Sequence, residues 1–243
     1  MDFELRYSQY NERSILIEWP SIIDENILND VLRFKALIET NTVKVLVNVI
    51  SSYNSLLVVY GSAIDNVNDS VLSLKNWYTN EDNSAALSSR LFEIPVCYEE
   101  EFAVDLAAYA KAVSRSKDAI INLHSSVIYK VYFIGFLPGF LYLGGLPKSL
   151  HLDRKNTPDL NIKKGAVGIG GKQTGIYPQD SPGGWHIIGS SPVEFFLPQE
   201  TPPCFIKAGD RVRFKVISKS EYFELKKRYA NASMNPEQFL CHD

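Results

Sequence analysis

The segment VGIGGKQTGIYPQDSPGGWHIIGSSP at 167–192 decides the fold of the larger part of this chain. A second segment, VYFIGFLPGFLYLGGLP, lies at 131–147. Most of both segments falls in the window 135–189, which holds 12 of the 14 glycines. Glycine has no side chain to pack and costs much conformational entropy on folding, so this density predicts tight turns or close backbone approach. Aromatic residues and isoleucines are interleaved with the glycines, and disordered linkers are poor in both. The window therefore predicts an ordered part of the chain that carries the function.

Composition sets the class of protein. A length of 243 residues with 45% apolar content predicts one large or two ordinary globular domains. Residues 1–90 carry 7 Lys and Arg against 12 Asp and Glu, and residues 91–243 carry 18 against 16, so no nucleic-acid partner is expected. Three widely spaced cysteines favour neither a disulfide framework nor a zinc site. We expect a cytoplasmic protein without a signal peptide or membrane segment.

The first 80 residues alternate between strand and helix patterns. Apolar residues at period two predict strands at 3–7, 15–19, 43–49 and 56–60, and helical spacing predicts helices at 23–38 and 67–78. The order ββαββα predicts an α+β domain in which helices cover a mainly antiparallel sheet. The polar stretch TNEDNSAALSS at 79–89 predicts a linker, which places the end of this domain near residue 90.

The pattern changes to mainly β after two further helices. We expect a strand at 94–96, helices at 102–113 and from the N-cap Ser116 to 127, and a charged helix at 221–229. Short runs rich in Val, Ile and aromatic residues predict strands at 129–136, 165–169, 175–177, 185–188, 193–197 and 211–217. They predict a closed β-barrel domain over 91–217. Residues 218–243 are then a C-terminal helix and a tail, and 230–243 are expected to be poorly ordered.

Standard nucleotide motifs do not fit the glycine-rich window. A phosphate-binding loop needs the spacing G-x-x-x-x-G-K-[ST] between a strand and a helix. The spacing from Gly165 to Lys172 is one residue too long, and Gln173 stands where a magnesium-binding hydroxyl is needed. The dinucleotide motif G-x-G-x-x-G also fails, because its third glycine would fall on Gln173. If ATP is used, we expect another protein to help bind it.

Two interpretations of Asp180, Ser181 and His186 remain open. They are the residue types of a hydrolase triad, but a fold usually brings triad members together from distant positions. Ser181 precedes a proline and two glycines, so a turn supported by Asp180 is favoured. Cys97 is expected to be a buried, inert thiol. His124 near a helix end is more typical of a hydrogen-bonded residue than of a general base.

The two quoted segments resemble the signature of the family formed by the B subunits of 5-oxoprolinase, also known as PxpB or KipI and as allophanate hydrolase subunit 1. IPVCY at 94–98, LHSS at 123–126 and AGDRVRF at 208–214 resemble family segments in the same order, so the likeness covers about residues 91–217. The family has an N-terminal α+β domain followed by a cyclophilin-like β-barrel. This agrees with the architecture predicted from periodicity.

The resemblance implies a joint activity. Three proteins of the PxpA, PxpB and PxpC (KipA-like) types together convert 5-oxoproline to glutamate with hydrolysis of ATP, and PxpB with PxpC is thought to phosphorylate the lactam. This chain is then a hydrolase component that is inactive without its partners. The implied cofactor is ATP bound together with a partner protein, with Mg²⁺ as its companion ion.

Phosphorylation of a lactam oxygen needs donors aimed at developing negative charge. The resemblance therefore implies catalytic roles for Arg154, Gln173 and Tyr177, with Arg154 also able to pair with the substrate carboxylate. Backbone N–H groups of the glycine-rich segments are expected to form an anion-binding nest, in which Gly168 also takes part. The residues expected to bind substrate are His124, Gly170, Gly171, Ser181, Gly183, Gly184 and Trp185. No metal-ligand set is predicted.

The sequence departs from the family pattern at two places. Where P-R-x-x-T-P-R is expected, residues 153–159 read DRKNTPD, so Asp159 replaces the second arginine and weakens the case for anion binding there. Where G-G-E-F-G-P-D-L is expected, residues 99–106 read EEEFAVDL, which predicts that a turn has become helix.

Two other functions of the family stay open at this point. One is inhibition of autophosphorylation of a sensor histidine kinase, for which an exposed aromatic groove on the barrel would suit docking of a peptide or helix. The other is a carboxyltransferase-like component of urea or allophanate metabolism. A shared fold does not separate these activities.

Overall fold

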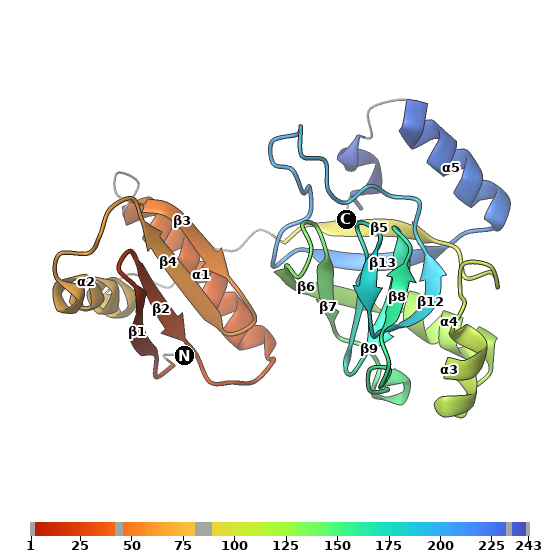
Figure 1. Cartoon of the computed structure of the whole chain (residues 1–243), viewed down its shortest axis with the longest axis horizontal. Helices are drawn as coiled ribbons and strands as arrows, with labels where there is room; N and C mark the ends of the chain where they lie inside the picture. The colour runs from red at the N-terminus through yellow and green to blue at the C-terminus, as the bar shows by residue number, and fades with distance from the viewer. Residues whose placement is uncertain (1–2, 42–45, 81–88, 232–234, 242–243) are drawn as a thin grey trace. The chain divides into compact units, whose positions relative to one another are not determined.

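The fold is described from a computed structural model, which covers residues 3–41, 46–80, 89–231 and 235–241. The chain divides into two compact units, Met1–Ser88 and Ser89–Asp243 (Figure 1). The predicted linker at 79–89 lies mostly outside the described residues. Within the described part, no helix is both long and apolar enough to cross a membrane.

The N-terminal unit is a two-layer α+β structure. Its elements are β1 (Arg6–Asn11), β2 (Ser14–Glu18), α1 (Glu25–Asn41), β3 (Leu46–Ser51), β4 (Ser55–Tyr60) and α2 (Val67–Asn80). The antiparallel sheet has the order β1-β2-β4-β3, which confirms the predicted ββαββα succession. Residues 43–45 of the predicted third strand lie outside the described residues. Alternate residues of β2 and β4 are buried with α1 and α2 in one core.

A buried carboxylate joins three elements of this unit. Asp30 on α1 is 9% exposed and accepts hydrogen bonds from Trp19 Nε1 and the Tyr78 hydroxyl, each at 2.7 Å. Arg33, one turn along α1, pairs with the same carboxylate at 2.9 Å. Because a buried charge needs partners, this network fixes β2 and α2 against α1.

The C-terminal unit contains most of the strands. Its elements are β5 (Leu91–Val96), α3 (Leu106–Ala112), α4 (Lys117–Ser125), β6 (Ile128–Ile134), β7 (Leu141–Gly144), η1 (Lys148–Leu150), β8 (Asp159–Ile162), β9 (Ala166–Gly170), β10 (Gln173–Ile176), β11 (Ser181–Gly183), β12 (His186–Ser190), β13 (Arg211–Val216), α5 (Lys219–Asn231) and η2 (Pro236–Phe239). Ser116 is the N-cap of α4, as predicted, and accepts from the N–H of Ala119. In Figure 1, α3 and α4 lie at one end of the curled sheet and α5 at the other.

The main sheet of this unit curls into a barrel. Its order is β12-β9-β10-β7-β6-β13-β5, with only β13 and β5 parallel among the neighbouring strands that the structure describes. The two edges meet where Cys97 and Ser190 exchange backbone hydrogen bonds of 2.8 and 2.9 Å. This contact between the edge strands agrees with the predicted β-barrel. Strands β8 and β11, which are separated in the chain by β9 and β10, pair antiparallel as a second, two-stranded sheet.

Two local predictions in this unit are wrong, and three short strands were missed. The predicted strand at 193–197 is an irregular segment that buries Val193 and Phe195 without joining a sheet. Residues 99–105 remain a turn, closed by hydrogen bonds from the N–H groups of Phe102 and Ala103 to the carbonyl of Glu99, so losing the family's glycines did not make it helical. Short β7, β8 and β11 were not predicted as strands.

The end of the chain packs against the barrel. Residues 230–243 were expected to be poorly ordered, but Phe239 is 5% exposed and Leu240 forms a bridge with Phe92. The N–H of Cys241 donates to the carbonyl of Leu91 at 2.9 Å. Within the described residues 235–241, the tail therefore covers part of the β5 edge. Residues 232–234 and 242–243 lie outside the described part.

The glycines of β9 and β10 serve the packing of one tryptophan. Alternate residues of a strand face opposite sides, and Val167 and Ile169 point into the barrel core while Gly168 and Gly170 face outward. A Cβ added at Gly170 would lie 2.5 Å from Cδ1 and Nε1 of Trp185, and one at Gly175 would lie 2.9 Å from Cζ3. The indole therefore lies directly on the backbone of β9 and β10, over a strip formed by Gly170 and Gly175 that has no side chains.

His124, which was expected to bind substrate, is instead part of the barrel core. It is 0% exposed, its Nδ1 lies 2.7 Å from the Tyr98 hydroxyl, and its Nε2 lies 2.8 Å from Thr174 Oγ1. Because Thr174 Oγ1 donates to the carbonyl of Gly168, it accepts from His124, which places the proton on Nε2. Burial lowers the pKa of His124 to about 3. The ring is thus a neutral, fully bonded structural group.

Replacing Gly170 with Ala is expected to lower the free energy of unfolding by about 1–3 kcal/mol, because the new methyl group displaces the Trp185 indole. Gly184→Ala is the matched control, since its nearest neighbours would be at 3.5 and 3.8 Å. It should change stability by less than about 0.5 kcal/mol. Urea denaturation followed by near-UV circular dichroism measures both. Equal effects of the two variants would contradict the packing role.

Because His124 is buried and neutral, we expect the free energy of unfolding to fall in acid. Its pKa is about 3 in the folded chain and near 6.5 when unfolded, so the unfolded state binds the proton first as pH falls. Between these values the group lowers the free energy of unfolding by up to about 1.4 kcal/mol per pH unit. His124→Gln should be less stable at pH 7 but show a shallower loss between pH 7 and 5 than the wild type, measured by urea denaturation. If the pH dependence of the free energy of unfolding were the same in His124→Gln as in the wild type, His124 would not be the cause of the acid sensitivity. His151→Gln is the control and should keep the wild-type pH dependence.

Candidate functional site

A cavity of about 260 Å³ lies on the outer face of the barrel, beside the strip covered by Trp185. We call it the aromatic pocket. Its walls come from the β6–β7 loop, β7, the segment between η1 and β8, and the segment from Tyr177 to Trp185. It is lined by Phe136, Phe140, Tyr142, Arg154, Pro158, Tyr177, Pro182, Gly183, Gly184 and Trp185.

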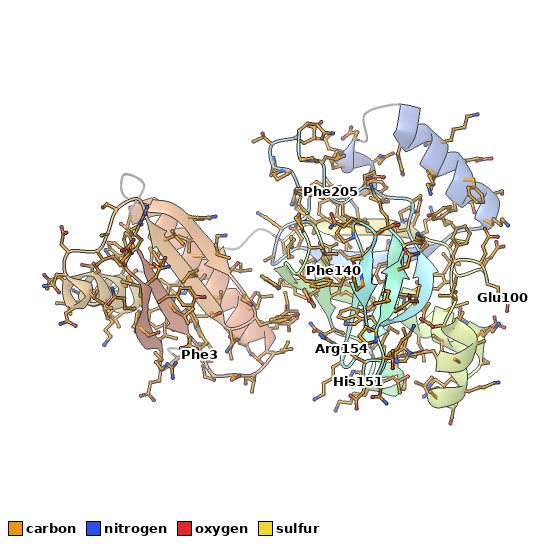
Figure 2. All side chains as sticks on the ribbon, viewed as in Figure 1. Phe3, Glu100, Phe140, His151, Arg154 and Phe205 are labelled. Atoms are coloured by element: carbon orange, nitrogen blue, oxygen red, sulfur yellow. The ribbon has the colours of Figure 1, made fainter. Side chains whose placement is uncertain are left out.

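Edge contacts between rings make the walls of the aromatic pocket rigid. The ring of Phe140 lies 4.7 Å from Tyr142, 5.0 Å from Tyr177 and 5.4 Å from Trp185, measured between centroids. Two of these contacts are nearly perpendicular, the arrangement favoured by the charge distribution of aromatic rings. Phe140 is 1% exposed and is the centre of the cluster. Figure 2 marks Phe140 and Arg154 on this unit.

Phe136 stands at the rim of the pocket in an unfavourable backbone conformation. Its φ is +70°, and the side chain is 61% exposed. The loop around it is closed by hydrogen bonds from the N–H of Gly135 to the carbonyl of Phe140 and from the N–H of Phe140 to the carbonyl of Leu137. A bulky residue in the left-handed region costs about 1–2 kcal/mol relative to its usual conformations. The fold therefore tolerates strain that places an aromatic ring in solvent.

Arg154 supplies the one charged side chain of the pocket lining. Its guanidinium lies 5.8 Å from the centroid of Trp185, and within the described residues it makes no hydrogen bond or ion pair. The adjacent backbone is fixed, because the N–H of Lys155 donates to the carbonyl of Gly184 at 2.7 Å and His186 Nε2 binds the carbonyl of Asp153 at 2.9 Å. A loop with a fixed backbone thus places a guanidinium with five N–H donors in the pocket lining.

Tyr177 contributes a protonated hydroxyl. The residue is 2% exposed, and a Cβ added at Gly183 would lie 2.4 Å from its hydroxyl oxygen, so only glycine fits beside it. Burial raises the pKa of Tyr177 to about 12, although a hydrogen bond from the backbone N–H of Trp185 acts in the opposite direction. At neutral pH this hydroxyl can donate a hydrogen bond but cannot act as a base.

The structure brings together about half of the residues predicted from sequence. Arg154, Tyr177, Gly183, Gly184 and Trp185 line the aromatic pocket. Outside its lining are Gln173, His124, Gly168, Gly170, Gly171 and Ser181. The N–H of Gly171 donates to the carbonyl of Leu152 at 2.8 Å, so it is not available to an anion. Gly168 and Gly170 lie within β9 between two paired strands, where their role is to receive Trp185.

Asp180, Ser181 and His186 do not form a triad. Asp180 accepts from the N–H of Lys164 at 2.8 Å and from Lys163 Nζ at 3.0 Å. His186 binds a backbone carbonyl, as given above, and Ser181 Oγ is buried without a hydrogen-bond partner in the described part of the chain. The turn interpretation does not hold for Ser181 either, because Ser181 begins strand β11 and Asp180 binds the segment between β8 and β9.

Sequence reasoning missed the apolar half of the pocket. Phe136, Phe140, Tyr142, Pro158 and Pro182 line it but were not predicted as site residues. The available signal was the motif FLPGF at 136–140, which sets two aromatic residues around a proline and a glycine. Such residues favour a fixed turn that exposes a ring.

The aromatic pocket by itself does not fit a nucleotide. The aromatic pocket, at about 260 Å³, is smaller than the 300–1,000 Å³ or so typical of pockets for larger ligands. It offers one guanidinium and no glycine-rich loop at a helix N-terminus, which triphosphate binding uses. Among residues 3–41, 46–80, 89–231 and 235–241, no three His, Cys, Asp or Glu side chains gather in a way that could hold a metal ion.

Comparison with known proteins gives relatives over most of the chain. The family model described as carboxyltransferase domain, subdomain C and D, matches residues 5–206. A protein from Escherichia coli O157:H7, named as the B subunit of 5-oxoprolinase, is 40% identical over 168 residues, 69% of this chain and 77% of that protein. One of the same name from Bacillus subtilis is 46% identical over 140 residues, which is 58% of each chain.

Solved structures share the fold of this chain. The crystal structure of TTHA0988 superposes with a TM-score of 0.72 at 29% identity, covering 85% of this chain but only 40% of that one. Kluyveromyces lactis urea amidolyase shares the fold at 19% identity, with a TM-score of 0.76 and coverage of 96% of this chain and 16% of that one. The family model and the relative from Escherichia coli show that the chain belongs to the carboxyltransferase domain family, subdomains C and D, and to the family of proteins named as B subunits of 5-oxoprolinase.

Proposed function

We propose that this chain is the PxpB component of an ATP-dependent 5-oxoprolinase, which converts 5-oxo-L-proline to L-glutamate together with PxpA-like and PxpC-like partners. The names of its relatives support a role in a multi-subunit hydrolase. The observation that carries the proposal is Arg154, which lines the aromatic pocket beside Trp185 and makes no hydrogen bond or ion pair within the described residues. A small cyclic amide with a carboxylate suits this combination.

The residues of this chain would bind and orient the substrate. The carboxylate would accept two parallel hydrogen bonds from Arg154, the geometry that guanidinium groups favour. The aromatic walls would exclude water from the ring, and the protonated Tyr177 hydroxyl would donate to an oxygen of the substrate. An unactivated amide carbonyl is a poor electrophile, and ATP, when bound, supplies the activation. Since the aromatic pocket does not fit a nucleotide, we assign binding of ATP to the PxpC-like partner or to a site shared with it.

The proposal is tested in the assembled complex. Co-expression with the PxpA-like and PxpC-like partners should give glutamate and phosphate in equal amounts, dependent on 5-oxoproline, and omission of this chain should abolish both. An assembled complex of all three proteins that releases neither product would refute the proposal.

Tyr177→Phe keeps the ring but removes the donor, so kcat of the complex is expected to fall about 100-fold, the usual effect of losing one such donor. The matched control is Tyr10→Phe, a 65% exposed tyrosine of the N-terminal unit, which should keep wild-type turnover. Coupled assays of phosphate release measure both variants, and size-exclusion chromatography verifies assembly. Full activity of the Tyr177 variant would remove this residue from the catalytic set.

A further inference from the structure

We propose that Asp105 is a positioning residue: one oxygen of its carboxylate holds the loop that carries Arg154 against the strand that follows Trp185. Asp105 directly precedes α3 and is not part of the lining of the aromatic pocket. The inference deepens the proposed function, and its kinetic test rests on that function. Three features of the molecule carry it: the orientation of the Asp105 carboxylate, the two groups that it binds and the place of these groups in the chain.

The carboxylate of Asp105 is turned away from its own helix. Asp105 occupies the N-cap position of α3, where an aspartate usually accepts from the free N–H groups of the first turn. It makes no such bond, whereas Ser116, the N-cap of α4, accepts from the N–H of Ala119. Helix α3 therefore lacks a stabilising contact that its own sequence offers. The groups that the carboxylate binds instead explain this orientation.

Both of these groups meet the same carboxylate oxygen. Asp105 Oδ2 accepts from the backbone N–H of Ile187 at 2.7 Å and lies 2.6 Å from Lys155 Nζ. The N–H of Asp105 also donates to the carbonyl of Ile187 at 2.9 Å, so Ile187 is bound at both of its backbone groups. The side chains of Asp105 and Lys155 are only 20% and 21% exposed, so salt screens this pair less than a surface pair. Asp105 thus bridges β12 and the loop at 153–155.

The two bridged positions flank the contact between Arg154 and Trp185. Lys155 directly follows Arg154, and Ile187 lies two residues after Trp185. The guanidinium and the indole, 5.8 Å apart, are therefore carried by the two segments that Asp105 joins. The backbone hydrogen bonds of the loop, given above, form two attachments, and the ion pair adds a third beside the residue that has to be placed. Its loss is expected to displace Arg154 without unfolding the barrel.

The first test follows the position of the guanidinium in the isolated full-length chain. The ring current of an indole shifts protons held over its face upfield, so Arg154 should give an upfield-shifted side-chain signal in NMR spectra of arginine-labelled protein. The signal is assigned by its absence from Arg154→Lys. Lys155→Met keeps the aliphatic part of the side chain but removes the ion pair, and it should reduce the shift by at least half. Lys155→Arg supplies a cation again and should restore the shift.

Asp105→Asn removes the charge from the other side of the ion pair and should reduce the shift of the Arg154 signal in the same way. Glu93→Gln is the matched control, because Glu93 pairs with Arg213 at 2.7 Å and is 31% exposed but lies outside the pocket lining. It should leave the signal unchanged. The same Arg154 signal in Lys155→Met and Asp105→Asn as in the wild type would overturn the inference.

The second test separates positioning from a purely structural role. In the assembled three-protein complex, Lys155→Met should raise KM for 5-oxoproline about fivefold or more and change kcat less than about twofold, because it displaces a group that binds substrate and transition state alike. Lys155→Arg should restore KM, and Glu93→Gln should leave it unchanged. If Lys155→Met lowers the urea midpoint and the yield of complex while the complex that assembles keeps the wild-type KM, the role is structural and the inference is wrong.

The inference and the proposed function fail separately. If the wild-type complex turns over 5-oxoproline, but Lys155→Met keeps the wild-type Arg154 signal and KM, the positioning role is wrong and the proposed function stands. If the Arg154 signal depends on both Asp105 and Lys155, but the assembled wild-type complex is inactive, the positioning role stands and the proposed function is wrong.

Discussion

The contact between the Trp185 indole and the bare backbone of β9 and β10 is the constraint on which the site depends. Any side chain at Gly170 or Gly175 would occupy the position of the ring. Glycine within a strand costs about 0.5–1 kcal/mol relative to alanine. Burying a tryptophan, which is 4% exposed here, offsets this cost at the two positions, since large apolar side chains contribute about 1.5–3 kcal/mol on burial. The glycines at these positions thus leave the space that the Trp185 ring occupies.

This packing also shapes the aromatic pocket. The centroid of the same indole lies 5.4 Å from that of Phe140 and 5.8 Å from the Arg154 guanidinium. One side chain therefore both forms part of the cavity wall and lies against the guanidinium. Gly183 allows the Tyr177 hydroxyl to lie beside the two-stranded sheet of β8 and β11, which closes another side of the pocket. Core packing and site geometry are therefore not independent on this face of the barrel. A substitution that moves the indole alters both.

Sequence periodicity predicted the architecture but not the roles of individual glycines. The order ββαββα followed from alternation and helical spacing because those patterns report local burial. The strand expected at 193–197 failed because its apolar residues fill the core without pairing. Gly168, Gly170 and Gly171 were assigned to anion binding, since nothing local shows that Trp185, fourteen or more residues later, lies over two of them. His124 was placed in the site for the same reason, because its partner Thr174 is 50 residues away.

The barrel separates its polar groups into two kinds. Inside, His124, Tyr98 and Thr174 satisfy one another, and burial keeps the histidine neutral. Outside, Arg154 keeps its charge and its donors without a described partner. Polar groups that are fully bonded in a sealed core stabilise a fold but cannot meet a ligand, whereas an unpaired guanidinium on the outer face can do so. A site on that face is also accessible to another protein, which the sealed interior is not. The chemistry of this chain is therefore expected outside the barrel, around Arg154 and Tyr177, and not among its buried titratable residues.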